Sequence, residues 1–142
     1  MLNSAERLEI DRLWKRKLEQ DASGLPQSLR HRNLEPPSAE FLHALAAGIG
    51  GRMVEIGGSS GISTIALAAA ARQTGASLLS LEIEPLRQTE ARDTLARLGL
   101  GSFVSFVLAD AAQVLPQQPV FDLALIDCEK EDYIRFFGQI YT

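Results

Sequence analysis

Short apolar runs alternate with longer, helically patterned segments from residue 52 to the end of the chain. Short apolar runs bounded by glycine or charged residues are typical of buried strands, whereas apolar residues repeated every three or four positions are typical of helices. The pattern predicts strands at 52–56, 78–83, 103–108 and 121–126, and helices at 62–73, 86–98, 111–115 and from about Glu131. This alternation predicts an α/β fold, a Rossmann-like parallel sheet with right-handed crossovers and helices on both faces.

The start of the chain predicts a peripheral helix. Asn3 and Glu6 have the spacing of a capping box, and a loose apolar stripe continues to about Gln20. The stripe consists of Leu8, Leu13, Trp14 and Leu18.

Prolines and glycines make residues 21–37 mostly loop. A second helix is expected from Ser38, as its N-cap, to Ala47, where several glycines follow. We therefore divide the chain into an N-terminal helix and loop, residues 1–37, and a Rossmann-like domain, residues 38–142.

The composition of 142 residues, 46% hydrophobic and 23% charged, suits one globular domain. A net charge of −4 gives no basic field for nucleic acid or an anionic membrane, and the early basic residues are expected to form a solvated helix face: Arg12, Lys15, Arg16 and Lys17. The single cysteine, Cys128, excludes an internal disulfide, and neither a signal-peptide core nor an apolar run of membrane-spanning length is found. These features predict a cytoplasmic protein without a membrane or nucleic-acid partner.

A glycine-rich segment joins the first predicted strand to the next helix. Gly57, Gly58 and Gly61 lack Cβ atoms where the backbone must turn tightly. The helix that opens near Ile62 presents unpaired N–H groups to anything bound at this turn. The segment therefore predicts a binding loop for a nucleotide-type cofactor.

Acidic residues stand at or near the ends of the predicted strands. They are Glu55, Glu82, Asp110 and Asp127. In an open parallel sheet the carboxyl ends of the strands share one rim, and ligands bind there at the point where the strand order reverses. We therefore expect these acids and Gly57 to line one ligand-binding rim.

The glycine spacing disfavours a dinucleotide cofactor. The fingerprint G-x-G-x-x-G, which binds a pyrophosphate, would place glycine at 59 and 62, where this chain has Ser59 and Ile62. A nucleotide-linked oxidoreductase is therefore the weaker alternative. S-adenosylmethionine has no phosphate and carries a sulfonium, an ammonium and a ribose diol, so an acidic rim suits it.

Individual residues fit parts of S-adenosylmethionine. Glu82 can accept hydrogen bonds from both ribose hydroxyls, and Ile83 can pack on the adenine face. Asp110 and the backbone N–H of Ala111 are expected at the adenine edge. Ser63, in the first turn of the helix, is expected to donate to the methionine carboxylate.

Four motifs carry a resemblance to a known family: Val54-Glu-Ile-Gly-Gly-Ser-Ser-Gly-Ile-Ser-Thr64, Leu81-Glu-Ile-Glu-Pro85, Leu108-Ala-Asp-Ala111 and Phe121-Asp-Leu-Ala-Leu-Ile-Asp-Cys-Glu-Lys-Glu-Asp-Tyr133. In order and spacing, over roughly residues 30 to 142, the chain resembles class I S-adenosylmethionine-dependent methyltransferases. It is most similar to the metal-dependent O-methyltransferases of the catechol and caffeoyl-CoA type. The resemblance implies O-methyl transfer to a small, hydroxylated, catechol-like acceptor with the help of Mg²⁺ or Ca²⁺.

The resemblance also implies roles for single residues. The cofactor loop corresponds to Glu55, Gly57, Gly58 and Ser63, the ribose acid to Glu82, and the adenine-side turn to Asp110 and Ala111. Asp127 matches the family's first metal-ligand aspartate. Lys130 matches the lysine that takes the proton from the acceptor hydroxyl, a role that a nearby cation assists by depressing the pKa of the lysine.

The family completes its metal site with an Asp-Asn pair on a later strand, and this chain stops at Thr142 before such a strand. The resemblance therefore implies a C-terminally truncated member that lacks the final strands of the sheet. The open apolar edge beside residues 121–126 makes a homodimer plausible.

Simpler interpretations stay open for these residues. The glycine segment also fits a plain tight turn, Asp127 a helix N-cap and Lys130 an exposed surface residue. At the level of the molecule, the alternative is a catalytically incomplete cofactor-binding or interaction module on a methyltransferase scaffold.

Overall fold

The computed structural model describes residues 1–24, 34–58, 61–127 and 138–140. In chain order the helices and strands are α1 (Ser4–Ala22), α2 (Pro36–Ile49), β1 (Arg52–Ile56), α3 (Ile62–Thr74), β2 (Ser77–Glu82), α4 (Pro85–Arg97), β3 (Val104–Leu108), α5 (Ala111–Val114) and β4 (Leu123–Ile126). Among the described residues, the 3₁₀ turns η2 (Gly101–Phe103) and η3 (Leu115–Gln117) lie before β3 and after α5. The predicted alternation of strands and helices is confirmed, and the helix expected from Glu131 begins outside the described residues.

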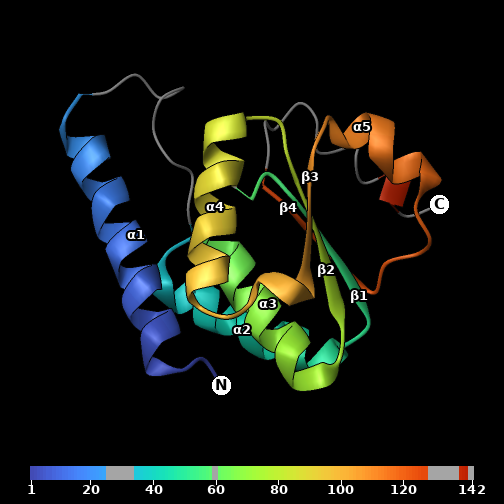
Figure 1. The fold of residues 1–142 in the computed structure, drawn as a ribbon, viewed down its shortest axis with the longest axis horizontal. Helices are drawn as coiled ribbons and strands as arrows, with labels where there is room; N and C mark the ends of the chain where they lie inside the picture. Colours follow the sequence, from blue (N-terminus) through green and yellow to red (C-terminus); the bar gives the residue numbers. More distant parts are fainter. Residues whose placement is uncertain (25–33, 59–60, 128–137, 141–142) are drawn as a thin grey trace.

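The strands form one parallel, four-stranded sheet in the order β3-β2-β1-β4 (Figure 1). The chain moves outward from β1 through β2 to β3, and then crosses back to place β4 on the other side of β1. The strand order therefore reverses between β1 and β4, which is the position where open sheets of this kind bind ligands.

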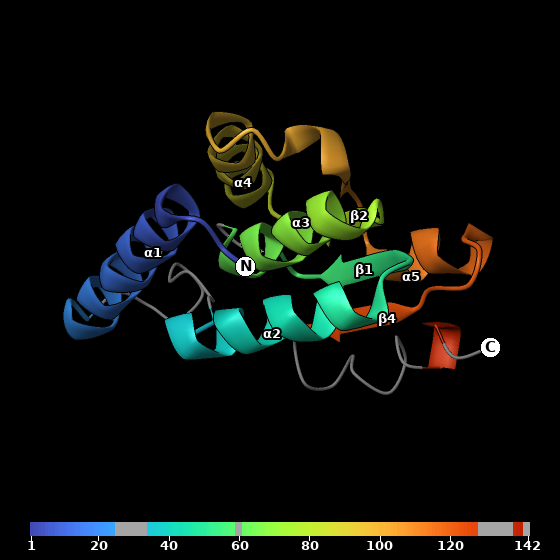
Figure 2. The same ribbon diagram turned by 90° about the horizontal axis from the view of Figure 1, so that it is seen from below.

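Helices cover both faces of the sheet, as predicted. On one face α1, α2 and α3 share a core with alternate strand residues such as Met53, Leu78 and Leu123. On the other face α5 and η3 pack on the intervening strand residues, including Val54, Leu81 and Ile126. Figure 2 shows α2 and α3 on one side of the sheet and α5 on the other. Successive side chains of each strand thus point to opposite faces of the sheet and contribute to two separate apolar layers.

Helix α1 begins with the predicted capping box: Asn3 accepts from the backbone of Glu6, and Glu6 accepts from the backbone of Asn3. The predicted apolar stripe is wrong in part, because Leu8 is 70% exposed and Leu18 is also exposed. The buried side instead carries Leu2, Glu6, Ile10 and Leu13. Glu6 can be buried because its charge is paired with Arg72 of α3.

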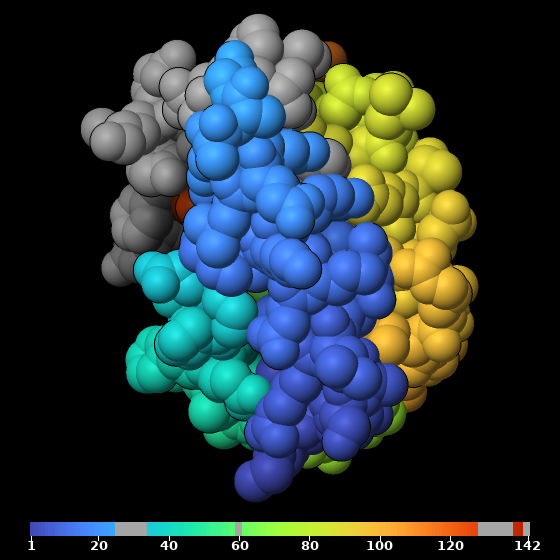
Figure 3. Space-filling view, turned by 90° about the vertical axis from the view of Figure 1, so that its left-hand side faces the viewer, coloured from blue at the N-terminus to red at the C-terminus, as the bar shows by residue number. Residues whose placement is uncertain are grey.

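Helix α1 lies across the molecule between α2 and α4 (Figure 3). Its basic residues are not simply a solvated face. Arg16 pairs with Glu90 of α4, Arg12 pairs with Glu9, and Lys17 pairs with Asp21. The ion pair of Arg16 therefore helps to attach α1 to α4.

The N-cap of α2 lies three residues before Ser38, the predicted cap. The cap position is Glu35, and Pro36 and Pro37 occupy the first two helical positions. Proline suits that place because its missing N–H has no partner in the first turn of a helix. The helix also continues through Gly48 to Ile49, past the predicted end at Ala47.

Within the described residues, no helix is long and apolar enough to cross a membrane.

Candidate functional site

Backbone hydrogen bonds beyond the strand ends tie the predicted site segments into one rim. The N–H of Gly57 donates to Leu81 at 2.8 Å, and the N–H of Ala109 donates to Glu82 at 3.1 Å. The N–H of Asp127 donates to Ile56 at 2.9 Å. The segments after all four strands are therefore neighbours at the carboxyl edge of the sheet.

We call the segment between β1 and α3, which contains Gly57, Gly58 and Gly61, the glycine turn. Its glycines are required for different reasons. Gly57 and Gly61 have φ angles of +87° and +117°, which side chains with a Cβ rarely adopt. Gly61 is also the N-cap of α3, and as a glycine it has no side chain to cap the helix. The first turn of α3, which carries the positive end of the helix dipole, therefore begins at the rim.

Gly58 lies against a buried polar cluster. A Cβ built at Gly58 would stand 2.6 Å from Glu55 Oε1 and 2.8 Å from Ser80 Oγ. Three hydroxyls donate to the Glu55 carboxylate: Thr64 and Ser80 to Oε1, the latter at 2.8 Å, and Ser63 to Oε2 at 2.9 Å. We call Glu55, Ser63, Thr64 and Ser80 the Glu55 cluster.

Burial raises the pKa of the Glu55 carboxyl, and the hydrogen bonds from Thr64, Ser80 and Ser63 oppose that rise. The side chain of Glu55 lies under the rim and not on it, since only 1% of the residue is exposed. Likewise the hydroxyl of Ser63 donates inward to Glu55. Ser63 therefore contributes to the rim through its position in the first turn of α3, and its hydroxyl is directed to Glu55.

Glu82 and Ile83 occupy the end of β2. The Glu82 carboxylate accepts from the backbone N–H of Ile83 at 2.8 Å and of Glu84 at 3.2 Å. These bonds orient a largely buried carboxylate at the rim. The side chain of Ile83 beside it is 72% exposed. The end of β2 therefore places an oriented acid next to an accessible apolar side chain.

Asp110 and Ala111 lie after β3, next to that pair. Asp110 is the N-cap of α5 and accepts from Ala112 N–H at 2.9 Å, while Ala111 is buried. The N-cap bond uses one carboxylate oxygen and fixes the direction of the side chain. The adenine-side turn of the prediction therefore lies beside Glu82, through the bond between Ala109 and Glu82.

Asp127 follows β4 on the opposite side of the glycine turn. Among the described residues, no three His, Cys, Asp or Glu side chains are grouped so that they could hold a metal. One carboxylate is a poor site for Mg²⁺ or Ca²⁺, so these residues do not by themselves fit a metal site. Lys130, the predicted base, lies outside the described residues.

The sequence prediction missed Thr64 and Ser80. Both are buried, and both belong to the Glu55 cluster. A signal was present, because Ser80 is a polar residue inside an apolar strand and stands in register with Glu55 of β1. Its recognition required the strand register, which the sequence did not provide.

Comparisons with known proteins agree with this geometry. Residues 54–140 match a family described as a methyltransferase domain. The catechol O-methyltransferase of Mycobacterium tuberculosis is 35% identical over 119 residues, which cover 82% of this chain and 52% of that protein. This chain therefore spans about half the length of the curated relative.

Two solved structures have the same fold. Cofactor-bound Rv0187 from MTB is 32% identical with a TM-score of 0.73, and the match covers 92% of this chain and 59% of that one. The Podospora anserina methyltransferase PaMTH1, solved with SAH, has a TM-score of 0.80 at 21% identity. That match covers 99% of this chain and 56% of PaMTH1, and at this identity it supports the fold alone.

Proposed function

This chain belongs to the class I S-adenosylmethionine-dependent methyltransferases, and we propose from this premise that its carboxyl rim binds S-adenosylmethionine. The observation that carries the proposal is the order of groups along the rim: Asp110, Glu82 and the glycine turn, joined side by side by backbone hydrogen bonds. The rim therefore has an acid, Glu82, and an apolar side chain, Ile83, on one side of the N-terminus of α3.

We assign the binding roles as follows. Glu82 accepts from the ribose hydroxyls, Ile83 packs on the adenine face, and Asp110 with the N–H of Ala111 faces the adenine edge. Gly57, Gly58 and the α3 end at Ser63 receive the methionine part. Glu55 acts from below, because its carboxylate is occupied by hydroxyls of the protein.

The proposed reaction is O-methyl transfer to a small hydroxylated acceptor. The bound cofactor supplies an electrophilic methyl group on its sulfonium. The chain's own part is to orient the two reactants, which supplies much of the rate in a reaction of this kind. We propose Lys130 as the base that takes the hydroxyl proton. The name of the M. tuberculosis relative supports a catechol-like acceptor.

Metal assistance is a further proposal, with Asp127 as one carboxylate ligand of Mg²⁺ or Ca²⁺. The described residues do not complete such a site, so we derive no step through a metal.

A second candidate function rests on the metal site, which the described residues do not complete. The rim can bind the cofactor without the turnover of an acceptor. In that case the chain is a cofactor-binding or interaction module on the methyltransferase scaffold.

We propose a cytoplasmic protein that acts on a small molecule, with no nucleic-acid or membrane partner. We also propose a homodimer, since β4 pairs with β1 on one side and with no other strand among the described residues. The mass of the protein in solution tests the dimer.

Calorimetric titration of the 142-residue chain with S-adenosylmethionine, with and without Mg²⁺, tests the proposed function. We expect saturable binding. Binding that is independent of Mg²⁺, without methylation of a catechol, would favour the binding module. Absence of binding by a folded sample would reject the cofactor site, and NAD serves as the control ligand for the dinucleotide alternative.

A further inference from the structure

We infer that Thr64 and Ser80 are positioning residues, which hold the Glu55 carboxylate in place under Gly58 and thereby fix the glycine turn. Neither residue belongs to the rim that faces the cofactor. The inference rests on the proposed function, because the turn that they fix is the proposed cofactor loop.

The first argument is that the two hydroxyls join three elements at one atom. Ser80 comes from β2, Thr64 comes from the first turn of α3, and both donate to Glu55 Oε1 on β1. Because β1 and β2 are in register at Glu55 and Ser80, the sheet fixes one donor. The other donor then sets how close the start of α3 comes to the sheet.

The second argument is the absence of space between the Glu55 cluster and the turn. The hypothetical Cβ at Gly58 stands closer than 3.0 Å to two atoms of the cluster, Glu55 Oε1 and Ser80 Oγ. The backbone at Gly58 thus rests directly on these atoms. A shift of the carboxylate is therefore transmitted to the turn.

The third argument is the cost of losing a donor. Glu55, Thr64 and Ser80 are all nearly or completely buried. A buried carboxylate that loses a hydrogen bond has no water to replace it, so the side chain must move or take up a proton. Either response changes the surface on which Gly58 rests.

The test compares variants that remove a hydroxyl with little change of volume. Thr64→Val and Ser80→Ala remove one donor each, and Thr64→Ser retains the donor. Thr94→Val is the matched control: Thr94 is a completely buried threonine of α4, and its hydroxyl accepts from Arg97 at 3.3 Å. The readouts are affinity for S-adenosylhomocysteine, thermal stability, and hydrogen exchange of the Gly57 and Gly58 amides without ligand.

We expect Thr64→Val and Ser80→Ala to weaken binding about tenfold and to speed exchange at Gly57 and Gly58. Thr64→Ser should bind like the wild type. Thr94→Val should lose stability at most, without a change in affinity or in exchange at the turn. A loss of affinity in excess of the loss of stability, rescued by serine, distinguishes positioning from general destabilisation.

Wild-type affinity and control-like exchange in both donor variants would overturn the inference. Should the wild type bind no cofactor, the proposed function fails, and the exchange comparison on the free protein still decides whether Thr64 and Ser80 hold the turn. Should Thr64→Val fail to fold, Ser80→Ala decides by the same readouts.

Discussion

At the scale of single residues, the acids at or near the rim differ in their hydrogen-bond partners. Glu55 is buried and bound by hydroxyls, which makes it part of the support under the turn. Glu82 and Asp110 accept from backbone N–H groups that point their carboxylates along the rim. Carboxylates that looked equivalent in the sequence thus differ in what they can contact.

Replacement of Glu82 by alanine should weaken cofactor binding by about 1–3 kcal/mol, since charge-assisted hydrogen bonds to the ribose would be lost. Calorimetric titration measures the change. Glu84→Ala is the control, because Glu84 is in the same turn but accepts from Leu86 N–H at the start of α4. Equal losses in the two variants would indicate a general effect of rim charge and would argue against a ribose contact at Glu82.

Gly58→Ala should destabilise the fold by about 1–3 kcal/mol, because the new methyl group overlaps Glu55 Oε1 and Ser80 Oγ. Cofactor affinity should fall as well. Gly48→Ala is the matched control: it lies inside α2 with nothing within 4 Å of the new Cβ. There alanine should stabilise by about 0.5–1 kcal/mol. Denaturant unfolding of both variants checks the opposite signs, and a neutral Gly58→Ala would show that the cluster yields easily.

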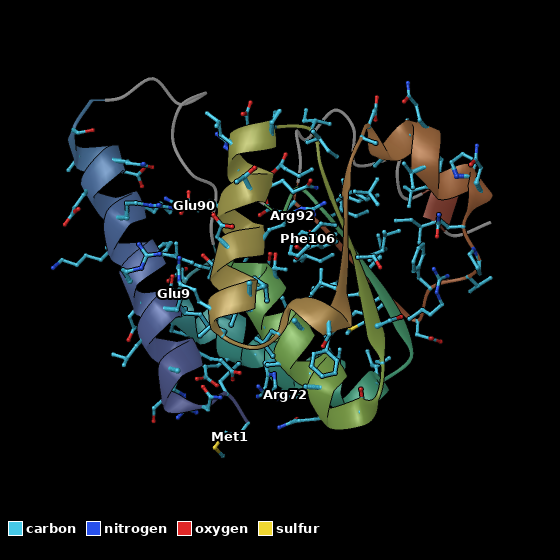
Figure 4. The ribbon with its side chains drawn as sticks, in the orientation of Figure 1. Met1, Glu9, Arg72, Glu90, Arg92 and Phe106 are labelled. Atoms are coloured by element: carbon cyan, nitrogen blue, oxygen red, sulfur yellow. The ribbon has the colours of Figure 1, made fainter. Side chains whose placement is uncertain are left out.

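At the scale of elements, α1 is attached to α4 by charges as well as by packing. Glu9 of α1 accepts from Arg12 at 2.5 Å and from Arg97 of α4 at 3.0 Å. Figure 4 shows Glu9 and Glu90 on the sides of α1 and α4 that face each other. On its other side α4 contacts β3: Arg92 donates to the backbone carbonyl of Phe106 at 3.2 Å, and its guanidinium lies over the ring of Phe106. Helix α4 is thus linked on both sides.

The hydrogen bond from Arg12, together with the charge of Arg97, holds the pKa of Glu9 below its ordinary value of 4.5. A carboxyl with a lowered folded-state pKa stabilises the fold above pH 4.5 and loses this contribution as the pH falls through the folded-state pKa. Glu9→Gln should therefore cost about 0.5–1 kcal/mol at pH 7 and progressively less below pH 4.5. Denaturant unfolding at several pH values measures the difference. Glu19→Gln, an exposed change on the same helix, is the matched control.

At the scale of the whole molecule, α1 shares the core of the sheet domain. Leu13 and Ile10 are buried in the same cluster as residues of α2, α3 and the strands. A helix that shares its core with the sheet should unfold together with it. The N-terminal segment is thus expected to be part of one cooperative unit.

Leu13→Ala should lower the stability of the whole chain by about 2–5 kcal/mol, as for other completely buried leucines. The chain's single tryptophan, Trp14, lies on α1, so its fluorescence follows that helix while far-UV circular dichroism follows all helices. Both signals should shift together to lower denaturant. A shift in fluorescence alone would show that α1 unfolds separately. Leu8→Ala, at an exposed position of the same helix, should shift neither signal appreciably.

The sequence by itself determined the order of the elements, the glycine turn and the acids after the strands. These are properties of local pattern, because strand and helix periodicities and glycine chemistry act over a few residues. Even the capping box at Asn3 was readable, since both of its bonds lie within three residues.

Only the tertiary structure decided which side of α1 is buried, where α2 begins, and which hydroxyls hold Glu55. Glu6 is buried because Arg72, far away in the sequence, neutralises it, and Ser80 meets Glu55 because two strands pair in register. Contacts of this kind depend on where distant segments meet, and no local pattern carries that information. The packing of α3 against the sheet therefore determines which side chains surround the glycine motif that the sequence already showed.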